Sequence, residues 1–356
     1  MNIGMIGLPL CGKSTIFDAV AAGQATQSHD PAKPRMAVVK VPDERMEWLR
    51  DMFKPKKFTL DTIEFLDFAG LFDTSPEAPR DSRIFGAVRD CDALMIVIRG
   101  FASDALPQPK GGIDPAREIT FIEAEMLLAD LDMAERRIER LEVQVKRPTP
   151  TQKQDQLELD VLKRCRDAIN DEKPIKTLHL RPEEEKPIRG FRFLSAKDVV
   201  IVVNIADDQP VNEAWSKALA QKYAEVHFVR GRIEAEIAEL EEKDRAEFMA
   251  EMGLKESARD RLIRSAFRAL GRGNFFTVGD DEVKAWPLER DASAVEAAGT
   301  VHTDLARGFI RAEVVHFDDL KALGSMKDVK AQNKLHLEGK DYKVKDGDIL
   351  NIRFSV

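Results

Sequence analysis

The sequence reads Gly7-Leu8-Pro9-Leu10-Cys11-Gly12-Lys13-Ser14 near its start, and this stretch has the spacing G-x-x-x-x-G-K-[ST]. Two glycines at this spacing let the backbone curl, so that successive N–H groups point at the α- and β-phosphates of a nucleotide. Lys13 can then reach the β- and γ-phosphate oxygens, and the Ser14 hydroxyl can ligate Mg²⁺. The apolar residues 1–6 predict a buried strand before the loop, and residues 14–20 predict a helix whose N-terminus favours an anion. A loop in this setting predicts a nucleoside triphosphate site made by residues 7–14 together with Thr15.

The composition is that of a globular protein. The 356 residues suggest two or three domains; 43% of them are hydrophobic, 33% are charged, and the net charge is -8. An acidic chain does not coat nucleic acid through bulk charge, so no DNA partner is expected and RNA contact would need a local basic face. Three scattered cysteines indicate neither a disulfide framework nor a zinc site. No apolar run reaches membrane-spanning length and no basic leader precedes the first strand, which predicts a cytoplasmic protein without a membrane partner.

Further apolar runs alternate with helical segments along the first two hundred residues. They lie at residues 37–41, 61–67, 93–98 and 199–204. Near-continuous Val, Ile and Leu runs separated by helices are typical of a parallel sheet that is covered on both faces. Together with the loop, they predict an α/β nucleotide-binding domain.

Residues 115–170 follow a helical period instead. Apolar residues recur at three- and four-residue spacing from Ile122 to Val145 and again from Leu157 to Ile169. A polar break at residues 147–151 separates these two arms, so an antiparallel helical hairpin, a short coiled coil, is predicted. A charged helical stretch at residues 234–272 comes next, and alternating runs with Gly- and Asp-containing turns after it predict a β-rich tail.

Two further short motifs follow apolar strands and could bind a nucleotide together with the phosphate-binding loop. Asp67 and Gly70 form D-x-x-G at the end of an apolar strand, so Asp67 can hold Mg²⁺ and the Gly70 amide can bond the γ-phosphate. Asn204-Ile205-Ala206-Asp207 follows the Val-rich strand, where P-loop GTPases carry N-K-x-D and the Asp accepts hydrogen bonds from guanine. These motifs predict Ser14 and Asp67 as metal ligands, and they add Gly70, Asn204, Ile205 and Asp207 to the nucleotide-binding residues.

With these motifs and its tail, the chain resembles the Obg-like ATPase (YchF) family, a translation-factor-class branch of the P-loop GTPases. Before the tail, the likeness is carried by the loop, Val41-Pro42-Asp43-Glu44-Arg45-Met46, Leu66-Asp67-Phe68-Ala69-Gly70-Leu71 and Ala129-Asp130-Leu131-Asp132. In the tail it is carried by Phe275-Phe276-Thr277-Val278-Gly279, Val283-Lys284-Ala285-Trp286, Val301-His302-Thr303-Asp304 and Leu337-Glu338-Gly339-Lys340-Asp341-Tyr342, among others. The resemblance implies a P-loop G domain at residues 1–117 and 198–274, a helical coiled-coil insertion at 118–197, and a β-grasp (ubiquitin-like) TGS domain at 275–356.

The resemblance also implies an activity. Family members hydrolyse ATP in preference to GTP, so Mg²⁺-dependent binding and slow hydrolysis of a purine nucleoside triphosphate are expected, with Lys13 as the catalytic cation. Leu71 stands where many GTPases have the Gln that orients the attacking water, and a leucine cannot polarise water. Contact with the ribosome or its RNA, through the helical arm and the TGS domain, would link this weak ATPase or GTPase to translation or to a stress response.

The chain departs from the family pattern in several places. Leu10 replaces the Asn that is the expected partner of a stimulating potassium ion, so potassium dependence is not carried over. Residues 72–80 replace a Gly-rich stretch, residues 105–108 lack the catalytic His, and no clean counterpart of the switch-I Thr lies near residues 30–34. Asp207 restores the acid of the GTPase motif where the family commonly has Glu. Two alternatives therefore stay open: a nucleotide-gated binding module with negligible hydrolysis, and a GTP-preferring GTPase.

Overall fold

A computed structural model describes residues 1–26, 33–68, 82–109, 111–252, 254, 256–289 and 291–355. By its contacts the chain divides into two compact units. The first unit consists of residues 1–37 and 64–259, and the second consists of residues 38–63 and 260–356. The domain limits that the resemblance implies assign residues 38–63 to the domain of the P-loop. Those limits stay a prediction.

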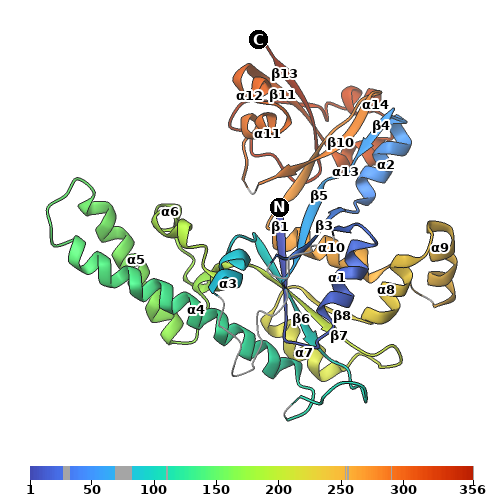
Figure 1. Ribbon diagram of the computed structural model, residues 1–356. Helices are drawn as coiled ribbons and strands as arrows, with labels where there is room; N and C mark the ends of the chain where they lie inside the picture. Colours follow the sequence, from blue (N-terminus) through green and yellow to red (C-terminus); the bar gives the residue numbers. More distant parts are fainter. Residues whose placement is uncertain are drawn as a thin grey trace. The chain divides into compact units, whose positions relative to one another are not determined.

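The P-loop belongs to a seven-stranded sheet with the strand order β2-β3-β5-β1-β6-β7-β8 (Figure 1). The strands are β1 (Asn2–Ile6), β2 (Ala25–Thr26), β3 (Arg35–Lys40), β5 (Thr62–Asp67), β6 (Ala93–Arg99), β7 (Val199–Asn204) and β8 (Val226–Val229). β1 pairs in parallel with β5 and β6, β6 pairs in parallel with β7, and β7 pairs in parallel with β8, whereas β2 and β3 are antiparallel. Every residue of β6 is buried, as expected for an apolar strand covered on both faces. The predicted α/β fold with a parallel sheet is confirmed.

Besides its strands, the first unit contains helices. They are α1 (Lys13–Ala21), α3 (Ser82–Arg89), α4 (Pro115–Gln144), α5 (Gln152–Asn170), α6 (Pro182–Ile188), α7 (Glu213–Lys222), α8 (Gly231–Glu239) and α9 (Glu242–Glu251), with short 3-10 turns η1 (Ile175–Leu178), η2 (Arg189–Phe191) and η3 (Leu194–Ala196). Ile122 of α4 and Leu219 of α7 pack on Ile96 and Val203 of the sheet. Met5 and Val97, which alternation places on the other sheet face, are also fully buried. No helix in the described ranges is both long and apolar enough to cross a membrane.

The helices α4 and α5 form the predicted antiparallel hairpin (Figure 1). Its core is apolar, with Ala134, Ile138 and Leu141 from α4 against Leu162 and Cys165 from α5. Ion pairs bridge the two helices at its surface, for example from Arg137 to Glu158 at 2.7 Å and from Lys163 to Glu142 at 2.7 Å. The hairpin is therefore held by an apolar seam with charged flanks, as in a coiled coil.

The second unit contains a six-stranded sheet with the order β12-β11-β13-β9-β10-β4. Its strands are β4 (Lys57–Thr59), β9 (Gly273–Thr277), β10 (Glu282–Leu288), β11 (Phe309–His316), β12 (His336–Glu338) and β13 (Asp348–Phe354). The helices are α2 (Glu44–Phe53), α10 (Ala258–Ala269), α11 (Ala294–Val301), α12 (Thr303–Arg307), α13 (Phe317–Leu323) and α14 (Met326–Ala331). The predicted β-rich tail is confirmed, but its short helices and the edge strand β4 were not predicted.

Candidate nucleotide-binding site

The loop from Gly7 to Gly12 leads from β1 into α1 through a turn that requires both glycines. A Cβ on Gly7 would lie 2.4 Å from the carbonyl oxygen of Val97, which is closer than real Cβ atoms approach backbone. Gly12 has φ +84°, and a Cβ there would lie 2.1 Å from the Nδ2 atom of Asn204. The glycines that define the motif are therefore fixed by steric fit within the protein.

The N-terminus of α1 faces the loop and has no acidic residue of its own helix beside it. Gly12 is the N-cap residue, no described side chain caps the helix, and its first turn carries no acidic residue. The first N–H groups of a helix have no partner within the helix, and the helix dipole places partial positive charge there. This end of α1 is suited to receive a phosphate group.

The two predicted metal ligands and the loop lysine lie together. Asp67 ends β5, where it pairs in register with Met5 of β1, and its side chain is only 3% exposed. The Ser14 hydroxyl donates a hydrogen bond to Asp67 Oδ2 at 3.3 Å, and the Lys13 ammonium forms an ion pair with Asp67 Oδ1. Hydroxyl and carboxylate oxygens are ligands that Mg²⁺ prefers, so this donor set fits that ion.

The described residues contain no cluster of three or more His, Cys, Asp or Glu side chains that could hold a metal. Mg²⁺ at phosphate-transfer sites is usually held by one or two protein oxygens together with the phosphates, and it keeps several waters. Ser14 and Asp67 are therefore a sufficient protein contribution to such a site.

Arg35 is a residue of this site that the sequence analysis missed. It begins β3, and its Nη1 atom lies 3.7 Å from Asp67 Oδ2 while its Nη2 atom pairs with Asp18. Its guanidinium also lies over the Phe17 ring, 4.7 Å from the ring centre. Asp67 thus faces two cations, Lys13 and Arg35. No motif marks an arginine at the start of a strand, and only its place beside the expected switch region could have drawn attention to it.

Asn204 connects the end of β7 to the phosphate-binding loop. Its side chain is buried; Nδ2 donates to the Cys11 carbonyl at 3.1 Å, and Oδ1 accepts from the Gly231 amide at 3.1 Å. Ile205 is 3% exposed and packs in the core under the sheet, so a nucleotide could reach only its backbone. Both are predicted as nucleotide-binding residues; the Asn204 side chain bonds Cys11 and Gly231, and the Ile205 side chain packs in the core.

Asp207 and the start of α8 offer polar groups where a base would be read. The Asp207 side chain is 37% exposed, and Oδ1 has no hydrogen-bond partner among the described residues, while Arg232 Nε lies 3.9 Å from Oδ2. Arg230 Nε likewise finds no partner in the described part of the chain. Oδ1 is buried from solvent, so only the exposed part of the Asp207 carboxylate could accept from an N–H group of a purine.

Leu10 and Cys11 differ in what they present to a ligand. Leu10 has φ +66° and is 48% exposed, a left-handed conformation that favours Gly and Asn over a branched apolar residue. Cys11 is buried, and burial raises the pKa of its thiol to about 12. The thiol therefore stays protonated and does not supply a reactive thiolate. Leu8 is partly buried against the core and Pro9 is exposed.

Several residues predicted for this site lie outside the described ranges. They are Gly70 and Leu71, the stretch 72–80 that replaces the family's Gly-rich segment, and residues 30–32 near the expected switch I. Their predicted roles stay predictions.

A half-buried acid, Glu118, lies beside the end of β6. Arg99 is 4% exposed and donates to the carbonyls of Phe101 at 3.1 Å and Pro107 at 3.0 Å. Glu118, in the first turn of α4, accepts a hydrogen bond from the Arg99 amide at 3.3 Å. Burial raises the pKa of Glu118 from 4.5 to about 7, because the charged carboxylate is desolvated.

This pKa predicts a pH-dependent stability. The folded state binds the Glu118 proton more tightly than the unfolded state. The contribution of Glu118 to the free energy of unfolding is therefore fully present below pH 4.5 and is lost as the pH rises to 7. A shift of this size corresponds to about 3 kcal/mol. Glu118→Gln should therefore raise the free energy of unfolding by up to about 3 kcal/mol at pH 8 and change it little at pH 4. Urea unfolding at both pH values measures the difference; the exposed Glu139→Gln on the same helix is the control, and an equal gain at both pH values would disprove the assignment.

The parallel sheet, with a G-x-x-x-x-G-K-S loop after β1 and an acidic residue ending β5, defines a P-loop protein of the GTPase fold class. The comparisons give the family. The chain is 34% identical over 367 residues to "Ribosome-binding ATPase YchF" of Bacillus subtilis (strain 168), with 100% of both chains covered. It is 36% identical over 361 residues to the protein of the same name from Haemophilus ducreyi, with 99% of both covered. The chain belongs to the YchF family.

The family model and the solved structures agree with this assignment. Residues 273–355 match the model YchF-GTPase_C, described as "Protein of unknown function (DUF933)". The YchF GTPase of Schizosaccharomyces pombe superposes with a TM-score of 0.85 at 26% identity, over 99% of this chain and 97% of that one. A GTP-binding protein from Pyrococcus horikoshii OT3 superposes with a TM-score of 0.59 at 17% identity over 100% of both chains, a likeness of fold alone.

Proposed function

We propose that this protein binds a purine nucleoside triphosphate with Mg²⁺ and hydrolyses it slowly, with ATP favoured over GTP. The observation that carries the proposal is the group made by Lys13, Ser14 and Asp67, with 3.3 Å between the Ser14 hydroxyl and the Asp67 carboxylate. An ammonium group, two metal-ligating oxygens and a helix N-terminus meet at one loop, which is the set of groups that binding a triphosphate requires.

Each residue has a defined part in this proposal. The loop amides from Gly7 to Ser14 and Thr15 surround the α- and β-phosphates, and Lys13 binds the β- and γ-phosphate oxygens. Ser14 and Asp67 hold Mg²⁺, which neutralises charge on the phosphates when it is bound. Asn204 keeps the loop in shape through Cys11, and the Gly70 amide bonds the γ-phosphate. Leu71, in place of a water-orienting Gln, makes hydrolysis slow.

The base preference rests on Asp207. Its partly exposed carboxylate could accept from the adenine amino group or from guanine N1 and N2. The curated relatives are named ATPases, which supports ATP. A GTP preference is the second candidate, because a free carboxylate at this motif is what guanine recognition uses.

The partner we propose is the ribosome, since the relatives are named ribosome-binding. The helical arm and the C-terminal domain are the surfaces we assign to this contact, and such a protein would act in the cytoplasm. Arg140 is exposed on α4, and Arg136 on the same helix pairs with the exposed Asp132. Cosedimentation with ribosomes should fall when both arginines are replaced by Glu; an unchanged pellet fraction would remove the arm from the proposal.

Single-turnover hydrolysis of labelled ATP and GTP tests the enzymatic part. The proposal predicts slow Mg²⁺-dependent release of phosphate that is lost in Lys13→Ala. Release that persists in that variant would come from another source and would exclude this site. Tight binding without release would identify the alternative, a nucleotide-gated module.

Arg35 should compete with Mg²⁺ for Asp67, because a cation 3.7 Å from a carboxylate repels a second one. Arg35→Ala should lower the Mg²⁺ concentration that half-saturates binding of fluorescent ADP by about fivefold, equivalent to about 1 kcal/mol. ADP is used because it lacks the γ-phosphate that Arg35 could also contact. Arg50→Ala, on the surface of α2, is the control. An increase in the Mg²⁺ requirement would show that Arg35 supports the metal site.

A further inference from the structure

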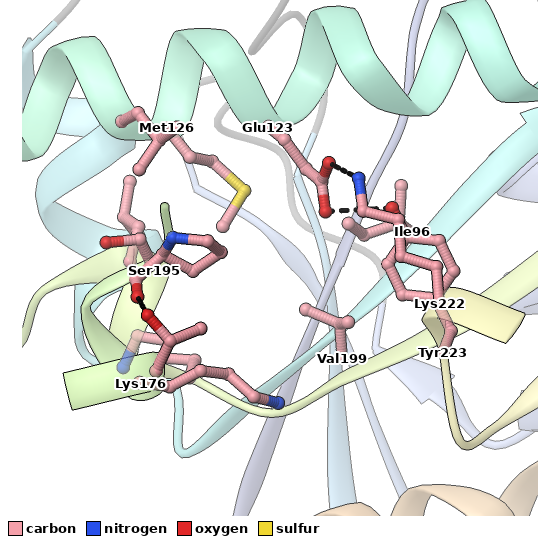
Figure 2. A pocket seen from close by; sticks show the side chains of 13 residues that line it. Ile96, Glu123, Met126, Lys176, Ser195, Val199, Lys222 and Tyr223 are labelled. Carbon is pink, nitrogen blue, oxygen red and sulfur yellow. Dashed lines mark hydrogen bonds and ion pairs between the residues drawn. The ribbon is translucent and has the colours of Figure 1, made fainter. Parts of the chain in front are cut away.

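A pocket of about 230 Å³ lies between α4, the turns η1 and η3, and the strands β6 and β7. Its walls are mainly apolar, with Ile96, Met126, Leu127, Leu194 and Val199 among the lining residues. Ile96 and Leu194 are almost fully buried, so the floor belongs to the core under the sheet. Figure 2 shows Met126 and Val199 beside the open space. None of these residues belongs to the nucleotide site.

The size of the pocket sets the size of a ligand. Protein interiors leave few voids larger than a water molecule, and an apolar cavity of about 150 Å³ takes up benzene. By proportion, about 230 Å³ accommodates an apolar body of roughly nine non-hydrogen atoms. This is the size of an indole ring or of a branched aliphatic chain.

The charged residues of the pocket are mainly cationic. Lys176, Lys197 and Lys222 line it, and Glu123 is the acid among the lining residues. Glu123 is already engaged, because its carboxylate pairs with Lys222 and accepts a hydrogen bond from the Tyr223 hydroxyl at 2.8 Å (Figure 2). Lys176 pairs at 2.8 Å with Asp198, an exposed residue outside the lining.

Lys197 differs from the other two lining lysines because the hydrogen-bond partner of its ammonium group is a neutral group. Its ammonium donates to the carbonyl oxygen of Cys91, a neutral acceptor. Burial lowers the pKa of Lys197, which shows that its charge is poorly solvated. Burial raises the pKa of the Cys91 thiol to about 12, so that thiol stays neutral, and Asp92 is the nearby carboxylate that favours the charged form of Lys197. A carboxylate bound in the pocket would add a second counter-charge beside Lys197.

We propose that this pocket binds a small organic anion whose apolar body, of about nine non-hydrogen atoms, packs on Ile96, Met126 and Val199 while its carboxylate lies against Lys197. The apolar walls select the body and the excess of lysines selects the charge. The site lies apart from the P-loop, so this binding does not depend on the proposed nucleotide function.

Titration of the ¹⁵N-labelled protein with indole-3-carboxylate and with the neutral indole-3-carboxamide tests the proposal. The amide signals of Val199 and Ile96 should shift saturably, and the carboxylate should bind at least tenfold more tightly than the carboxamide. Lys197→Met keeps the stem and removes the charge, so it should abolish this preference. Lys217→Met, on the exposed face of α7 and paired with Glu213, should leave it unchanged.

Val199→Phe separates the pocket from surface binding, because the larger side chain would fill it. Both ligands should then bind at least tenfold more weakly. The proposal fails if neither ligand shifts these signals at millimolar concentration, if the two bind equally to the native protein, or if Val199→Phe has no effect. The spectrum of each variant shows directly whether it is folded.

Discussion

Replacing Lys13 by Ala should weaken ATP binding by at least 100-fold and abolish the slow hydrolysis. The ammonium group would be the main cation on the β- and γ-phosphate oxygens, and such preorganised contacts contribute several kcal/mol. Calorimetric titration measures the affinity, and single-turnover assays measure the hydrolysis. The fold should persist, because Asp67 keeps its contacts with Ser14 and Arg35.

Lys217→Ala is the matched control for this result. Lys217 is exposed on α7 and pairs with Glu213 four residues earlier, an interaction that contributes about 0.3–0.5 kcal/mol. Its removal should leave ATP affinity unchanged. If Lys13→Ala bound ATP as well as the native protein, the loop from Gly7 to Ser14 would not be the triphosphate site.

Asp130→Asn should lower the free energy of unfolding by about 3–5 kcal/mol, the largest stability effect we expect. Asp130 of α4 is fully buried and pairs with Arg89 at 2.5 Å. It also accepts hydrogen bonds from the amides of Leu194 and Ser195 and from the Ser195 hydroxyl, at 2.7–3.0 Å. The substitution would leave the buried Arg89 cation without its counter-charge and place an NH₂ group among donors.

The sequence offers a control two residues away on the same helix. Asp132 is 60% exposed and pairs with Arg136. Asp132→Asn should change the free energy of unfolding by no more than about 0.5 kcal/mol. Urea unfolding of both variants gives the comparison, and similar losses for the two would mean that the buried network around Asp130 does not anchor η3 to the helix.

Local patterns predicted much of the fold. The apolar runs at β6 and β7 are short and rich in β-branched residues, which favours strands, and the three- and four-residue spacing of the arm favours helices, so the sheet and the hairpin could be predicted from local sequence. The place of residues 38–63 in the second unit could not be predicted from local patterns. β4 is short and polar, and it pairs with β10 across more than two hundred residues, from Lys57 to Glu282. Such long-range pairing leaves no local signal.

Some residues of the candidate site could likewise be predicted from the sequence, and others could not. The motif identified Lys13, Ser14 and Asp67, because phosphate and metal chemistry fixes both their types and their spacing. Arg35 and Glu118 carry no motif, since they reach the site only through the packing of β3 beside β5 and of α4 against β6. The motif also predicted Asn204 as a nucleotide-binding residue, but it could not predict that the buried side-chain amide bonds the Cys11 carbonyl and the Gly231 amide.

The most direct measurement is a calorimetric titration of ATP and ADP, with and without Mg²⁺, into the purified protein. We predict one saturable site per chain, tighter binding of ATP in Mg²⁺ than in its absence, and loss of that binding in Lys13→Ala. Absence of saturable heat with both nucleotides, or equal binding by the variant, would contradict the assignment of the loop at Gly7 to Ser14 as a Mg²⁺-dependent triphosphate site.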